Sequence, residues 1–204
     1  MTLSAFLAAW AIQLVAAASP GPAILMSART GVTEGFRTAA WLSLGIGLGA
    51  VVWALAALFG LALLFAVAPM LFWAFKVAGA LFLLWIAVQM WRHAPEPLDM
   101  GATDRPPRSA ASALRLGLVT QLANPKPAVF FGAVFVGTVP PGTSAPWLVA
   151  LLLAILANEL FCNLVVARAF SFEGPRLAYA RLKAGIDRTF GGVLALLGLK
   201  IVLT

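Results

Sequence analysis

Two short motifs place prolines inside stretches that are otherwise long and apolar enough to cross a membrane. The first apolar stretch is interrupted by Ser19-Pro20-Gly21-Pro22, and the fourth by Asn124-Pro125-Lys126-Pro127. A proline removes a backbone donor and clashes with the carbonyl four residues earlier, so each motif predicts a helix break. In lipid the freed backbone groups need a partner inside the protein or in a water-lined cavity. Two breaks at matching places in the two halves of a chain are typical of a transporter binding site.

Each motif also carries a capping residue in front of its first proline. Ser19 precedes Pro20, and Asn124 precedes Pro125. Ser and Asn are favoured N-caps, and proline is favoured at the first helical position. Each break is therefore predicted to start a half-helix whose free N–H groups and positive dipole end point into the protein. Helix N-termini bind anions, which makes an amino-acid carboxylate the expected ligand. The alternative is a pair of proline kinks that neighbouring side chains close, with no ligand.

Glu159 is the only carboxylate deep inside a predicted span. A charge at that depth costs several kcal/mol, so the group should be paired, protonated or functional. It could bind a substrate ammonium or carry a proton that couples transport, and Asn163, four residues later, shares its helix face. The alternative is a structural ion pair with Lys126.

The predicted substrate-binding residues are Ser19, Pro20, Gly21, Pro22, Asn124, Pro125, Lys126, Asn158, Glu159 and Asn163, and Glu159 is also the predicted coupling residue. Gln13 and Gln121, isolated polar residues within spans, are expected to form interhelical hydrogen bonds.

The composition is that of an integral membrane protein. Of 204 residues, 62% are hydrophobic and 10% are charged, whereas about a quarter of a soluble domain is charged. The net charge of +7 comes mostly from bases in the gaps between apolar runs, so no nucleic-acid partner is expected. With one cysteine and one histidine, neither a disulfide nor a metal site nor another cofactor is expected. The predicted spans also lack the nucleophile–base pair that an intramembrane enzyme needs.

Six stretches approach the roughly 20 apolar residues that a spanning helix needs: Leu3–Ser27, Thr38–Val67, Met70–Trp91, Leu116–Val136, Ala145–Ala167 and Thr189–Leu203. The last is short and is expected to begin a little earlier, near Gly185. No Lys or Arg precedes the first stretch, which is therefore expected to be a mature helix and not a signal peptide. The loops after spans one, three and five are rich in Lys and Arg, while the N-terminus and the loops after spans two and four have none. The positive-inside rule then places both termini outside.

The two halves resemble each other, because similar segments recur in the same order. These are the two proline motifs and, at the third span of each half, Lys76-Val77-Ala78-Gly79-Ala80 and Arg188-Thr189-Phe190-Gly191-Gly192. An odd number of spans per repeat inverts the second copy. The predicted fold is an all-α membrane protein with six transmembrane helices in two inverted three-helix repeats, spans one and four being broken. Residues 1–93 form the first repeat, 94–112 a cytoplasmic linker and 113–204 the second repeat. Gly45 and Gly49 predict close helix packing, within the monomer or across a dimer.

The chain resembles the lysine exporter (LysE/RhtB-type) family of bacterial amino-acid effluxers over nearly its whole length. The resemblance lies in Ser-Pro-Gly-Pro, in Gly31…Gly35 and Gly45…Gly49, and in Gln121-Leu122-Ala123-Asn124-Pro125-Lys126. It implies a multi-pass exporter in the bacterial cytoplasmic membrane, with a zwitterionic amino acid or derivative as substrate. It further implies a proton or cation gradient as the driving force, and it allows a homodimer. Pro127 departs from the family pattern and stiffens the second break.

Two other functions are compatible with a small membrane protein of this kind. A divalent-cation exporter would need several Asp, His or Cys ligands inside the membrane, and Glu159 is the only carboxylate at that depth. A non-transporting accessory subunit would show no transport on its own.

Overall fold

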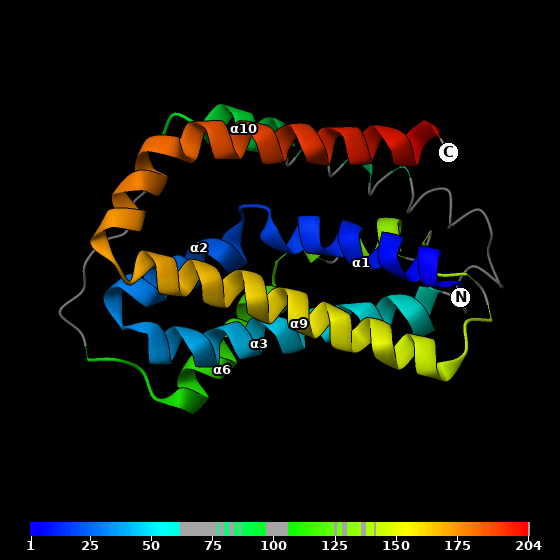
Figure 1. The fold of residues 1–204 in the computed structure, drawn as a ribbon, viewed down its shortest axis with the longest axis horizontal. Helices are drawn as coiled ribbons and strands as arrows, with labels where there is room; N and C mark the ends of the chain where they lie inside the picture. Colours follow the sequence, from blue (N-terminus) through cyan, green and yellow to red (C-terminus); the bar gives the residue numbers. More distant parts are fainter. Residues whose placement is uncertain are drawn as a thin grey trace.

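The regular structure of the described residues is entirely helical. The computed structural model describes residues 1–61, 77, 80–81, 84–85, 87–96, 106–124, 126–127, 130–135, 138–140 and 142–203. Its helices are α1 (Leu3–Ala18), α2 (Pro22–Thr33), α3 (Phe36–Leu55), the π-helix η1 (Ala56–Leu61), α6 (Ala110–Leu122), the π-helix η2 (Phe130–Phe135), α9 (Ala145–Phe170) and α10 (Glu173–Leu203) (Figure 1). The predicted all-α class is confirmed.

Helices long and apolar enough to cross a membrane occur where the sequence predicts the second and fifth spans. They are Phe36–Gly60 and Ala145–Phe170. α1 and α2 together pass the same test as a pair that is bent by 54° between Ala18 and Pro22, so the first apolar stretch is interrupted at the predicted motif. The predicted third span, Met70–Trp91, lies largely outside the described residues. The six-span count and the inverted repeat remain predictions.

Two helix starts differ from the sequence prediction. α6 begins at Ala110, inside the predicted linker, because the Ser109 side chain accepts a hydrogen bond from the Ser112 N–H (3.3 Å) and caps the helix. α10 begins at Glu173, well before the predicted sixth span. The segment before that span is rich in basic residues, which indicates a loop, but most of its residues are also good helix formers. The helix therefore extends beyond the apolar part.

Glycines bring α3 against two neighbours within the monomer. A Cβ at Gly45 would overlap the carbonyl of Leu114 in α6, and a Cβ at Gly117 in α6 would overlap the carbonyl of Leu42 in α3. Two residues after Gly45, Gly47 of α3 faces Leu156 of α9. The small residues thus let helix backbones touch. The sequence left open whether these glycines pack within the monomer or across a dimer, and the structure shows packing within the monomer.

The α2–α3 turn, the α9–α10 turn and the start of α6 lie at one end of the molecule, and the two chain termini lie at the other (Figure 1). Gly35, with a φ of 86° in the left-handed region open to glycine, makes the α2–α3 turn. Glu34 in that turn pairs with Arg108 before α6 (2.9 Å). Ser171 in the α9–α10 turn donates to the Gly31 carbonyl (3.3 Å). Termini at a common end are what the charge pattern predicts, while the direction across the membrane stays a prediction.

Candidate functional site

The first break separates the C-terminus of α1 from the N-terminus of α2. Ser19 is the C-cap of α1, and its hydroxyl donates to the Ala16 carbonyl (2.7 Å). α2 begins at Pro22 after Gly21, and no side chain caps its first turn. The prediction that Ser19 caps a half-helix starting at Pro20 is therefore wrong. The Ser19 hydroxyl bonds back into α1, and Pro22 takes the first helical position that prolines favour.

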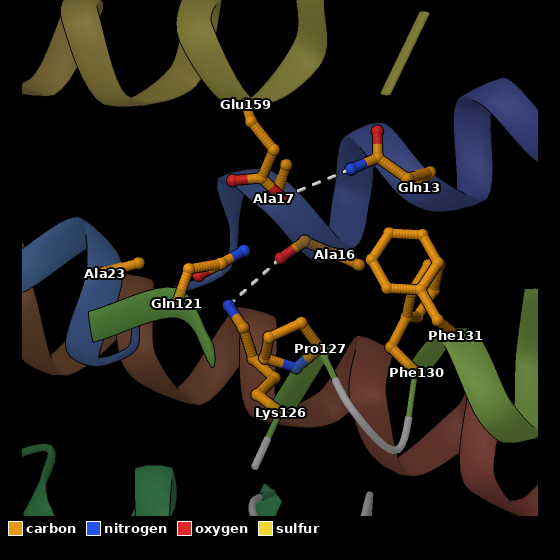
Figure 2. Close-up of a pocket in the computed structure, with 10 residues that line it drawn as sticks. All are labelled: Gln13, Ala16, Ala17, Ala23, Gln121, Lys126, Pro127, Phe130, Phe131 and Glu159. Atoms are coloured by element: carbon orange, nitrogen blue, oxygen red, sulfur yellow. Dashed lines mark hydrogen bonds between the residues drawn. The ribbon is translucent and has the colours of Figure 1, made fainter. Parts of the chain in front are cut away.

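In the second break, Asn124 acts as predicted. Its Oδ1 accepts a hydrogen bond from the Lys126 backbone N–H (3.1 Å), and Lys126 and Pro127 are helical. Pro125 lies outside the described residues. The capped turn directs the Lys126 side chain back toward the first break (Figure 2).

The Lys126 ammonium binds the end of α1. Its Nζ donates to the carbonyls of Ala16 (3.1 Å) and Ser19 (2.9 Å) and to the Ser19 hydroxyl (2.9 Å). These acceptors match the three donors of an ammonium group. The C-terminus of a helix is its negative end, which favours a cation there. The two breaks, more than 100 residues apart in the sequence, are thereby held together by one side chain.

Glu159 of α9 faces the same space from the opposite side. Its Oε1 accepts from Gln13 Nε2 (3.3 Å), and its Oε2 accepts from Asn163 Nδ2 (3.3 Å). Among the described residues, no ion pair within 4.0 Å joins Glu159 to Lys126. The alternative of a closed Lys126–Glu159 salt bridge is therefore wrong for this structure.

A small cavity lies between the two charges (Figure 2). Its volume is about 20 Å³, room for about one water molecule. Most of the wall is apolar, with a carboxylate and an ammonium facing it from different elements. The lining residues are Gln13, Ala16, Ala17, Ala23, Gln121, Lys126, Pro127, Phe130, Phe131 and Glu159.

Asn158 and Asn163, which the sequence places in the site, are not among the lining residues. Asn158 accepts from Trp10 Nε1 (3.0 Å) and donates to Gln13 Oε1 (2.6 Å). Asn163 accepts from the Ser27 hydroxyl (2.8 Å). Through these bonds α9 binds α1 and α2, the helices on both sides of the first break. Asn163 thus contacts Glu159 directly, and Asn158 contacts the Gln13 amide that donates to Glu159.

Of the residues that line the cavity, only Lys126 and Glu159 were predicted as site residues; the others, Gln121, Phe130 and Phe131 among them, were not. Gln13 forms interhelical hydrogen bonds as predicted. For Gln121 the same prediction is wrong, because its buried Oε1 has no hydrogen-bond partner. The spacing of Gln121 and Asn124 is one helical turn, which is the signal that could have placed Gln121 beside the break. Phe130 and Phe131 have no comparable signal among the many apolar residues.

The fold and site together define a helical membrane protein that keeps opposite charges inside its apolar bundle, beside broken helices. The chain belongs to the LysE type translocator family, whose family model matches residues 14–204. The chain is 34% identical over 206 residues to the threonine efflux protein of Escherichia coli K12, covering 99% of each chain.

Other relatives carry related names. The threonine efflux protein of Salmonella typhi is 33% identical, covering 95% of each chain. The leucine efflux protein of Klebsiella pneumoniae is 28% identical, covering 70% of this chain and 68% of that protein. No solved structure matches the chain.

Proposed function

We propose that this protein exports a small neutral amino acid, of the size of threonine, from the bacterial cytoplasm. The observation that carries the proposal is that Lys126 and Glu159 face one cavity without pairing to each other. A zwitterion has the complementary charges, so its carboxylate can bind Lys126 and its ammonium Glu159. Hydrogen bonds between charged groups are the strong ones, and they favour such a ligand. The efflux relatives support the same substrate class.

The start of α2 adds to the carboxylate side of the proposed site. Its first turn has no side-chain cap, and Ala23 in that turn lines the cavity. Uncapped N–H groups and the positive helix end favour an anion. Ala16, Ala17 and the two phenylalanines give the cavity an apolar wall, which suits a small side chain once the cavity has widened.

Glu159 is the proposed coupling residue of a proton antiporter. The same carboxylate can hold either a proton or the substrate ammonium, so the two compete for it. Such competition makes the release of one depend on the arrival of the other, which is the requirement for exchange. A cation other than the proton is the alternative coupling ion. Of the described residues, no three His, Cys, Asp or Glu side chains gather as a metal site would require, and we do not propose metal export.

The cavity must widen for transport, because it has room for about one water. The Lys126 bonds to Ala16 and Ser19 join the two breaks, and the substrate carboxylate would compete with these carbonyls for the ammonium. We propose that this exchange of partners accompanies the opening of the site. Both termini would be external and residues 94–112 cytoplasmic, in two inverted repeats. A homodimer remains a prediction from the family resemblance.

The test is transport by purified protein in liposomes loaded with single amino acids. A proton gradient that is acidic outside should drive efflux. Glu159→Gln should abolish gradient-driven efflux, because the amide cannot ionise. If substrate exchange survives in this variant, Glu159 serves only in proton coupling. If exchange is also lost, Glu159 binds the substrate ammonium as well. Glu173→Gln, an exposed change at the start of α10, is the matched control. Wild-type efflux rates in Glu159→Gln would contradict the coupling role, and no transport of any amino acid by the wild type would favour an accessory subunit.

A further inference from the structure

We infer that Gln121 recognises a hydroxyl group on the side chain of the substrate, which makes it a specificity-determining residue. The inference rests on the proposed function and narrows the substrate to small hydroxyl-bearing amino acids. It comes from the polar groups of the cavity wall and from which of them already have partners.

Three of the four polar or charged lining residues are engaged. Lys126 binds the end of α1 and Glu159 accepts two amide donors. Gln13 donates to Glu159 and accepts from Asn158 (2.6 Å). The fourth, Gln121, is 2% exposed, and its Oε1 has no partner. Buried polar groups in native proteins are nearly always hydrogen-bonded, so an unpaired one at a cavity requires an explanation.

The Gln121 side chain is fixed at its base and free at its end. Its backbone carbonyl accepts from Trp53 Nε1 (3.2 Å). A Cβ at Gly49 of α3 would lie 2.7 Å from the Gln121 Cβ, so the stem packs directly on the α3 backbone. Figure 2 shows the amide end between Glu159 and Lys126. The terminal amide thus borders the space that a ligand held by both charges would occupy.

A carboxamide suits a hydroxyl because it offers both an acceptor and a donor, and the hydroxyl offers the same. Turning the amide over exchanges the two, so Gln121 can meet a hydroxyl in either sense. A site that hydrogen-bonds a substrate hydroxyl discriminates strongly against the analogue without it, because the polar group of the site is then left unpaired. Threonine and valine differ by this hydroxyl and have nearly the same shape.

The experiment compares threonine and valine in liposomes containing wild-type protein, Gln121→Met or Gln89→Met. Gln121→Met keeps the length of the side chain and removes both hydrogen-bonding groups. Gln89→Met makes the same change at a position outside the cavity lining. We expect the wild type and Gln89→Met to prefer threonine by at least about tenfold in kcat/KM, and Gln121→Met to lose that preference while still transporting valine.

Thermal stabilisation of the purified proteins provides a second readout that does not need transport. Threonine should raise the unfolding temperature of the wild type more than valine does, and both should act equally on Gln121→Met. An unchanged threonine-to-valine ratio in Gln121→Met contradicts the inference while leaving the proposed function intact. An equal loss of both substrates also contradicts it, since Gln121 would then contact a group that all amino acids share. A wild type that neither transports nor is stabilised by any amino acid overturns the proposed function together with the inference.

Discussion

The two proline motifs look alike in the sequence, but the structure gives them complementary roles. At Ser19–Pro22 the chain presents helix ends: the carbonyls that finish α1 and the uncapped start of α2. At Asn124 the chain forms a capped turn that delivers a charged side chain, Lys126. The ammonium from the second break binds the carbonyls of the first.

A motif that recurs in the sequence need not repeat its chemistry. Two identical breaks would present helix ends of the same kind to each other, whereas a lysine in one break satisfies the carbonyls freed in the other. Gly21, at the position that corresponds to Lys126, completes the match. A Cβ there would lie 3.3 Å from Lys126 Nζ, so the glycine leaves room for the ammonium.

Removing the lysine should have the largest effect on this arrangement. In Lys126→Met the substrate carboxylate loses a charged partner, and the Ala16 and Ser19 carbonyls lose their donor. Charged hydrogen bonds contribute about 1.5–3 kcal/mol, so we expect substrate affinity to fall roughly 10- to 100-fold and the unfolding temperature to drop.

Lys183→Met is the matched control for this change. Lys183 also donates to a backbone carbonyl, that of His93 (2.9 Å), and also has little exposure, but it lies outside the cavity. The Lys183→Met variant should lose stability without losing affinity for the substrate. Equal substrate affinity in both variants, measured by counterflow, would show that Lys126 does not bind the substrate.

Gly21→Ala should have an intermediate effect, and it tests whether the breaks fit each other. The added methyl approaches the Lys126 Nζ and Cε at 3.3 and 3.6 Å, so the ammonium must shift by a few tenths of an ångström. We expect kcat/KM to fall about tenfold, because displaced binding groups lose much of their effect. Gly192→Ala, with no neighbour within 4 Å, should transport normally. A Gly21→Ala protein that matches Gly192→Ala in liposome assays would mean that the close fit has no functional role.

The smallest effect should come from the bond that joins α2 to α9. Ser27→Ala removes the hydroxyl that donates to Asn163 (2.8 Å), at a cost of about 1 kcal/mol. Ser43→Ala is the control, because the buried Ser43 hydroxyl donates to its own helix at Ala39 (2.8 Å). If the bond positions Glu159 through Asn163, the proton-driven efflux rate should fall severalfold in Ser27→Ala only. Equal rates in the two variants, at equal stability, would limit Ser27 to packing.

Sequence reasoning predicted the parts of the fold that depend on local chemistry. The helical class, the interruption at Ser19–Pro22 and the Asn124 cap follow from apolar length, proline geometry and capping preference. The role of Ser19 could not be predicted from such rules. Its hydroxyl could bond either to the end of α1 or to the start of α2. In the structure it donates to the Ala16 carbonyl of α1 and accepts from the distant Lys126 ammonium.

The candidate site could be predicted from the sequence only at residues whose burial in an apolar span costs free energy. Glu159 and Lys126 were recognisable because a charge within an apolar span is expensive. Their partners were not, since Gln13 reaches Glu159 across 146 positions of the chain and Lys126 reaches Ala16 across 110. Asn158, adjacent to Glu159 in the sequence, points to Trp10 and Gln13. Helix rotation and packing decide such contacts.

In the proposed site, Lys126 of the second break binds the carboxylate of a zwitterion and Glu159 of α9 binds its ammonium. The most direct measurement uses two analogues of the best-exported amino acid, its methyl ester and its des-amino acid, as competitors in counterflow. The wild type should bind each analogue at least about tenfold more weakly than the parent. Lys126→Met should no longer distinguish the ester from the parent but should still reject the des-amino acid, and Glu159→Gln should show the reverse. If both variants keep the wild-type ratios for both analogues, the zwitterion does not bind between these two residues.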